Sequence, residues 1–252
     1  MEMNEIKREN RQALPKYLLV LLLCAIGGGA LGFAAGWVGH SSLSEEILET
    51  VGAALTALAP WAMAVTGLGA VGAIWALYRR AKRLFSGWDG EDEATMDRAE
   101  ELLNWGLLLD SVEMVLGMFF FAVGMEGQGP GAVWCFVLFI LTMLLLVLFQ
   151  QKIVDLTRRM APEKQGSVYD LRFKKKWLES CDEAEQRQIG QAAYKAFNVV
   201  NGACGLLWVL LILLSYAFHF SVQLPVFLVC LLWLLLSVTY TLECIRLGRR
   251  KG

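Results

Sequence analysis

The stretch LLLDSVEMVLGMFFFAVG, residues 107–124, is mostly apolar but contains two carboxylates, Asp110 and Glu113. It belongs to a longer run over 103–124 that contains no basic residue. At about 1.5 Å per helical residue, a run of roughly 20 residues crosses a hydrocarbon core of about 30 Å. The stretch is therefore typical of a membrane-spanning helix that carries acids in its interior.

Apolar runs of similar length recur along the chain, which has 252 residues, 56% of them hydrophobic and 19% charged. A soluble domain does not gather its apolar residues in runs of this kind. The first run follows basic residues, as a signal peptide would, but its length favours a retained span. We expect an all-α fold, a polytopic integral membrane protein in which residues 1–252 form a single membrane domain. Its six transmembrane helices, in three hairpins, are predicted at about 17–38, 58–78, 103–124, 131–149, 197–218 and 225–246.

The basic residues predict the orientation of these spans. None of the 23 Lys and Arg lies in the segments 39–57, 125–130 or 219–224. They lie instead near both termini and in two loops, 79–102 and 150–196. Under the positive-inside rule, the two loops and both termini are therefore cytoplasmic.

The first outer segment is longer than the other two. Over residues 43–58 apolar side chains recur at helical spacing, opposite three glutamates. Pro60 suits the first turn of the following span. We therefore expect an outer interfacial helix over 43–58 that ends at Pro60.

The second and third hairpins share a pattern of polar and small residues. The same intervals of four, three and four residues separate Gly106, Asp110, Glu113 and Gly117 in one span and Tyr194, Asn198, Asn201 and Gly205 in another. This indicates a parallel repeat of hairpins two and three, a common way to build transport proteins.

Asp110 and Glu113 are three residues apart and share one face of their helix. An ionised carboxylate at the membrane centre costs at least ~2.5 kcal/mol, and no span core contains Lys or Arg. Three outcomes are open for Glu113: it is protonated, it binds a cation or lines a wet cavity, or it bonds to amides such as Asn198 and Asn201. The four residues form a predicted intramembrane polar site, which serves either function or interhelical adhesion.

Glycines offer a second kind of helix contact, because they let backbones approach closely. In the first span they form a GxxxGxxxG pattern, which serves packing within the chain or dimerisation. The glycines predicted to pack helices are Gly28, Gly32, Gly36, Gly106, Gly117 and Gly205.

The second cytoplasmic loop is predicted to bind lipid or a partner. Its segment LRFKKKW, residues 171–177, interleaves basic and aromatic residues, which suits an anionic inner leaflet. Ser180 and Glu183 match a capping box for the following helix. The residues of this predicted surface are Lys174, Lys175, Lys176, Trp177, Asp182, Glu183 and Glu185.

Other kinds of chemistry have no support in the sequence. None of the six cysteines lies in an outer loop and no CxxC occurs, which argues against a disulfide framework or a thiolate metal site. Metalloprotease, serine hydrolase and phosphate-loop motifs are all missing. We expect no enzyme, no cofactor, no metal site and no nucleic-acid partner.

Three segments carry a resemblance to a known family: GGGALGF at 27–33, WDGEDEA at 88–94, and APEKQGSVYDLRFKKKWLESCDEAEQRQIGQAAYKAF at 161–197. They resemble Gram-positive bacterial membrane proteins catalogued as domain of unknown function 3169. The resemblance covers almost the whole chain. It implies a multi-pass protein of the bacterial plasma membrane with six helical spans, and it implies no activity.

Two functions of different classes follow from these residues. The first is a permease-like transporter, or transporter subunit, for a proton, cation or small solute. An ATP-driven version would need a separate ATPase as its partner, since the chain has no phosphate loop. The second is a non-transporting accessory, immunity or stress-sensing membrane protein that binds a regulatory partner through 79–102 and 150–196.

Overall fold

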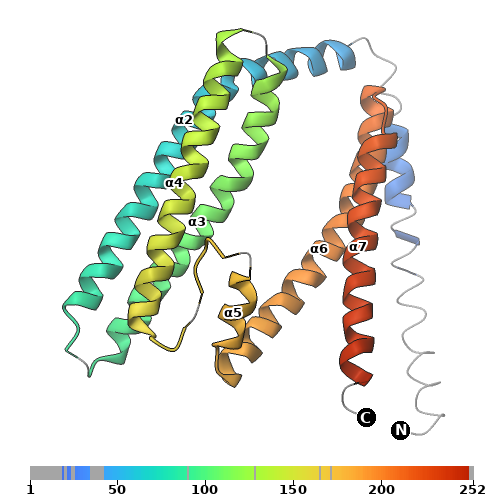
Figure 1. The fold of residues 1–252 in the computed structure, drawn as a ribbon. Helices are drawn as coiled ribbons and strands as arrows, with labels where there is room; N and C mark the ends of the chain where they lie inside the picture. Colours follow the sequence, from blue (N-terminus) through green and yellow to red (C-terminus); the bar gives the residue numbers. More distant parts are fainter. Residues whose placement is uncertain are drawn as a thin grey trace, which may run out of the picture. The chain divides into compact units, whose positions relative to one another are not determined.

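The computed structural model describes residues 19, 22–23, 26–34, 43–89, 91–127, 129–164, 166–170 and 172–249. Within these ranges all regular secondary structure is helical, in agreement with the expected all-α fold. The labelled helices of Figure 1 are α2 (Leu43–Ser86), α3 (Glu93–Glu126), α4 (Pro130–Met160), α5 (Phe173–Glu179), α6 (Glu183–Phe218) and α7 (Gln223–Arg249).

Among the described residues, five helices are long and apolar enough to cross a membrane: α2, α3, α4, α6 and α7. They contain the last five predicted spans. The first predicted span, 17–38, falls partly outside the described residues, although residues 26–34 are helical. By length and composition, these helices suggest a membrane protein.

The helices extend well beyond the predicted spans and into the two segments predicted as loops. The 34 residues of α3 make it about 50 Å long at 1.5 Å per residue. Only 87–92 separate α2 from α3, so most of the expected loop 79–102 is helix. Likewise, much of 150–196 belongs to α4, α5 and α6. Lys, Arg and Glu are good helix formers, so leaving the apolar run does not end a helix.

The expectation that a short helix ends at Pro60 is wrong. Residues 43–58 are helical, but α2 continues through Pro60 to Ser86. A proline inside a helix removes one backbone hydrogen bond, and packing on both sides of it holds the helix here. Ala59 and Met63 are buried in the same cluster as Cys135 of α4.

The chain divides into two compact units, and each is described by itself. One contains Met1–Glu49 and Gln191–Gly252, and the other is Thr50–Gly190. In the second unit α2, α3 and α4, coloured cyan to yellow in Figure 1, pack side by side. We call Thr50–Gly190 the three-helix unit and the other the α6–α7 unit.

Two apolar clusters form the core of the three-helix unit. The large cluster is made of Ile74, Ala81, Ala99, Leu103, Leu146, Ile153 and Leu156. The small cluster is made of Ala59, Met63 and Cys135, with Phe120, Phe121, Val123, Leu138 and Phe139 packed on it. Each cluster contains residues from all three helices, so α2, α3 and α4 pack together at two positions along their length.

In the α6–α7 unit, one polar and one aromatic contact join α6 to α7. Trp233 Nε1 on α7 donates a hydrogen bond to Asn201 Oδ1 on α6 over 2.7 Å. Phe197 stacks on Tyr240 with ring centroids 4.2 Å apart. The described part of this unit leaves most of its apolar surface exposed, as suits helices that face lipid.

Candidate functional site

One stripe of α3 faces the other helices of its unit. Its buried residues are Ala99, Leu103, Gly106, Asp110, Glu113, Gly117 and Gly124. They follow one another at intervals of three, four or seven residues, which is the spacing of a helix packing seam. The predicted stripe of small and polar residues therefore faces the bundle, and it carries both acids inside.

Glu113 is held by a hydroxyl from α2. Its side chain is 2% exposed, and its Oε1 accepts a hydrogen bond from Thr66 Oγ1 over 3.2 Å. A methyl group built on Gly67 would lie 2.9 Å from Thr142 Oγ1 of α4 and 3.6 Å from Glu113 Oε1. The absence of a side chain at Gly67 thus lets polar groups from three helices converge.

Asp110 lies one turn away in the same seam and is 4% exposed. Its Oδ1 is buried and has no hydrogen-bond partner. An unpaired polar atom in an apolar interior costs on the order of 1–3 kcal/mol. Asp110 and Glu113 are therefore similarly buried but differently bonded. We call Thr66, Asp110, Glu113 and Thr142 the polar layer.

The polar layer is enclosed by the two apolar clusters. Along α3 it lies between Leu103 of the large cluster and Phe120 of the small cluster. Along α4, Thr142 lies between Cys135 and Leu146. Neither α2 over 51–77 nor α4 over 136–151 contains a charged residue. Two carboxylates thus lie in an apolar core with no basic partner on these helices.

The polar layer supplies oxygen atoms and no imidazole or thiolate. Within the described residues, no group of three or more His, Cys, Asp and Glu could hold a metal ion. The arrangement is suited to bind a proton or a small monovalent cation, which needs fewer charged ligands than a divalent metal.

Asn198 and Asn201 lie in the α6–α7 unit, so their predicted pairing with the acids stays a prediction. Asn198 is exposed within that unit, and Asn201 accepts the bond from Trp233.

The predicted packing glycines differ in their surroundings. A methyl group at Gly106 would lie 3.1 Å from Ile153, and one at Gly117 would lie 3.0 Å from Met143. Gly205 faces Trp233 at 3.6 Å. Gly28 and Gly32 have nothing within 4 Å in the described chain, and Gly36 lies outside it.

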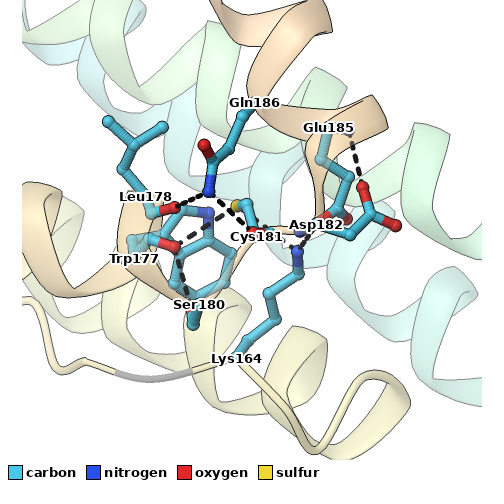
Figure 2. Close-up of polar contacts among 8 residues, drawn as sticks. All are labelled: Lys164, Trp177, Leu178, Ser180, Cys181, Asp182, Glu185 and Gln186. Atoms are coloured by element: carbon cyan, nitrogen blue, oxygen red, sulfur yellow. Dashed lines mark hydrogen bonds and ion pairs between the residues drawn. The ribbon is translucent and has the colours of Figure 1, made fainter.

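A second polar cluster lies where the α4–α5 connection meets the start of α6 (Figure 2). Lys164 is 5% exposed; it forms an ion pair with Glu185 and donates to Cys181 Sγ over 3.4 Å. Burial lowers the pKa of Lys164, but its bonds to Glu185 and Cys181 outweigh this and raise the pKa above its ordinary value. Lys164 therefore stays charged at neutral pH. We call these three residues the lysine anchor.

The capping box of α6 is not the predicted pair. The backbone N–H of Glu185 donates to Asp182 Oδ1 over 2.8 Å, and the N–H of Asp182 donates to Glu185 Oε2 over 3.1 Å. Ser180 instead donates its hydroxyl to the Trp177 carbonyl, and Glu183 is exposed. The box moves by two residues because α5 ends only at Glu179. Glu185 thus serves the cap and the lysine anchor together.

Helix α5 presents the predicted basic surface. Lys174, Lys175 and Lys176 are exposed, and Lys176 Nζ lies 2.6 Å from Asp170 Oδ2. Trp177 is half-buried, and its ring lies 5.5 Å from that of Phe173. The three lysines are thus exposed, although Lys175 and Lys176 pair with acids of the same segment, whereas Trp177 mainly packs within the unit.

A family model described as Protein of unknown function (DUF3169) matches residues 11–244. The chain belongs to this family. No curated protein and no solved structure matches the chain.

The DUF3169 match contains both the polar layer and the lysine anchor. Sequence reasoning found the acids of this family member but missed Thr66, Thr142 and Lys164. A signal for the threonines was present, because each is the lone hydroxyl residue of an otherwise apolar run. Nothing in the sequence separates Lys164 from its basic neighbours.

Proposed function

We propose that this protein is a multi-pass membrane permease, or the membrane subunit of one, that binds a proton or another small cation in its polar layer. The observation that carries the proposal is the burial of Asp110 and Glu113 between two apolar clusters. Ionisable groups inside a membrane are costly, and they typically mark ion and proton pathways. Interhelical adhesion alone needs no acid, because a neutral amide of the same size would supply it.

The proposed setting is a bacterial plasma membrane crossed by six helices, with the second and third hairpins as a parallel repeat. The distribution of basic residues supports cytoplasmic termini. The end of α2, the start of α3 and the end of α4 lie at one end of the three-helix unit (Figure 1). Basic residues gather there, at 79–83, 98 and 152–159, as the positive-inside rule requires of a cytoplasmic face.

The driving force of the proposed transport is an ion gradient. The sequence contains no phosphate-binding loop, so an ATP-driven form needs a separate ATPase. A proton gradient needs no such partner. The exposed lysines of α5 suit contact with the anionic inner leaflet.

Flux measurements test the proposal. Purified protein in liposomes with an imposed pH gradient is expected to carry protons or monovalent cations, and Glu113→Gln is expected to abolish this flux. Glu126→Gln is the matched control, because Glu126 lies on the same helix and is exposed. Absence of flux from the folded wild type, or equal flux from Glu113→Gln, would contradict a transport role for the polar layer.

The second candidate function is that of an accessory, immunity or stress-sensing membrane protein. The lysine anchor favours it, since the ion pair of the buried Lys164 with Glu185 fixes the segment between α4 and α6 and thereby presents exposed charges on α5 and α6. Complementation of a deletion strain separates the two functions. Loss of function in a Lys174→Glu, Glu183→Lys double variant, with Glu113→Gln fully active, would support the accessory function.

A further inference from the structure

The two acids of the polar layer differ in one respect that bears on their ligand. Glu113 Oε1 receives the hydroxyl of Thr66, whereas Asp110 Oδ1 receives no donor although it is buried. A carboxylate that keeps its charge in an apolar interior needs donors or a counterion. Asp110 has neither a donor nor a counterion on α2, α3 or α4. Its apolar surroundings therefore favour the protonated, neutral form of its side chain.

We propose that the ligand of the polar layer is the proton and that Asp110 is the residue that exchanges it, while Thr66 positions Glu113. The inference rests on the proposed function and names its ligand. Uptake adds a proton from the aqueous phase to a carboxylate oxygen of Asp110, forms an O–H bond and removes a negative charge. Release reverses this step, and no other reactant is required.

The polar and charged groups around the polar layer favour a proton as its ligand. One turn along α3 from Asp110, Thr66 of α2 bonds to Glu113, and Thr142 of α4 lies beside Gly67. The titratable groups in these parts of the unit are Glu113 on α3 itself and Cys135, which lies in the small cluster. The basic residues of α2 and α4 begin only at 79 and 152. No fixed cation therefore competes for the carboxylate.

The layer would reach the ligand number of a divalent metal only if every oxygen atom of both carboxylates and both hydroxyls coordinated at once. Calcium takes six to eight oxygen ligands, and magnesium requires about six in octahedral geometry. The layer offers two carboxylates and two threonine hydroxyls, while the surrounding backbone carbonyls are engaged within α2, α3 and α4. A proton needs a single oxygen atom, which Asp110 Oδ1 provides.

Infrared difference spectroscopy of the full chain in liposomes tests the inference directly. Selective ¹³C labelling of aspartate shifts aspartate carboxyl bands away from those of glutamate. We expect a protonated aspartate band near neutral pH that disappears on alkalinisation, is lost in Asp110→Asn and is retained in Glu113→Gln. Ser111→Ala, at the exposed neighbouring position, should leave the band unchanged. Replacing sodium with potassium or choline should leave it unchanged as well.

Three results would overturn the inference: persistence of the band in Asp110→Asn, its removal by sodium or potassium in the wild type, or a neutral-pH band found only with labelled glutamate. The last needs no variant, so it decides the matter even if Asp110→Asn fails to fold. A band with the expected behaviour but no flux would contradict the transport function and leave the inference standing. Flux driven by sodium, with no aspartate band, would support the transport function and contradict the inference that Asp110 exchanges a proton.

Discussion

Thr66 on α2 donates a hydrogen bond to Glu113 on α3 over 3.2 Å, and this bond joins positions 47 residues apart in the sequence. It connects the lone hydroxyl of one apolar run to an acid inside another. A buried acceptor that loses its donor bears the full cost of desolvation. The bond therefore fixes both the register of α2 against α3 and the position of the Glu113 carboxyl group.

Thr66→Val should destabilise the three-helix unit. It keeps the shape of the side chain but leaves Glu113 Oε1 without its donor, so we expect the free energy of unfolding to fall by about 1–3 kcal/mol. Denaturant unfolding in detergent micelles measures this. Thr56→Val is the control, because Thr56 Oγ1 bonds to the Gly52 carbonyl of its own helix. Equal losses in the two variants would mean that the bond to Glu113 stabilises nothing.

Gly67→Ala and Gly69→Ala should change stability in opposite directions. A methyl group at Gly67 would lie 2.9 Å from Thr142 Oγ1, whereas one at Gly69 would meet nothing within 4 Å. We expect Gly67→Ala to cost about 1–3 kcal/mol through crowding. Gly69→Ala should instead stabilise α2 by about 0.5–1 kcal/mol, because alanine is the better helix former. Thermal unfolding of both variants checks the contrast, and stabilisation by Gly67→Ala would show that the polar layer is loosely packed.

Much of the fold could be predicted from the sequence, because helical spans are long and their signal is local. The apolar runs predicted five of the observed helices. The interval between Asp110 and Glu113 predicted that both share one face of their helix, and both are buried on that face of α3. The ends of helices were less predictable. Pro60 did not stop α2 because burial of Ala59 and Met63 holds both sides of the proline.

The contacts of the candidate site could not be predicted, because they join distant segments. Nothing near Glu113 in the sequence indicates that Thr66 is its partner. The capping box was misplaced for a similar reason. Ser180 and Asp182 are both good cap residues, and the choice between them depends on where α5 ends and on Lys164, which binds Glu185 from 21 residues away.

Lys164→Met should loosen the start of α6. The variant keeps an apolar stem but removes the ion pair with Glu185 and the bond to Cys181. Since the Glu185 side chain is 41% exposed, water screens the pair, and we expect a cost of only about 1 kcal/mol. Amide exchange over 181–186 should therefore accelerate by about fivefold. Hydrogen–deuterium exchange with mass spectrometry measures this, and Lys174→Met on exposed α5 is the control. Unchanged exchange in Lys164→Met would show that the capping box alone holds this segment.

The attachment of α5 should weaken in acid through Asp170. Hydrogen bonds from Lys176 and from the Arg172 N–H lower the pKa of Asp170 below its ordinary value of 3.8. A lowered pKa in the folded state contributes stability that is fully present above the unfolded value of about 3.9 and is lost as the pH falls through the folded value. Protection of the 173–179 amides, corrected for intrinsic exchange, should therefore be constant between about pH 5 and 8 and fall below about pH 4. Lys176→Met should raise the pKa of Asp170 and reduce this acid dependence, whereas Lys175→Met should retain it because Lys175 pairs with Glu179. Identical pH profiles for the two variants would show that Lys176 does not set the titration of Asp170.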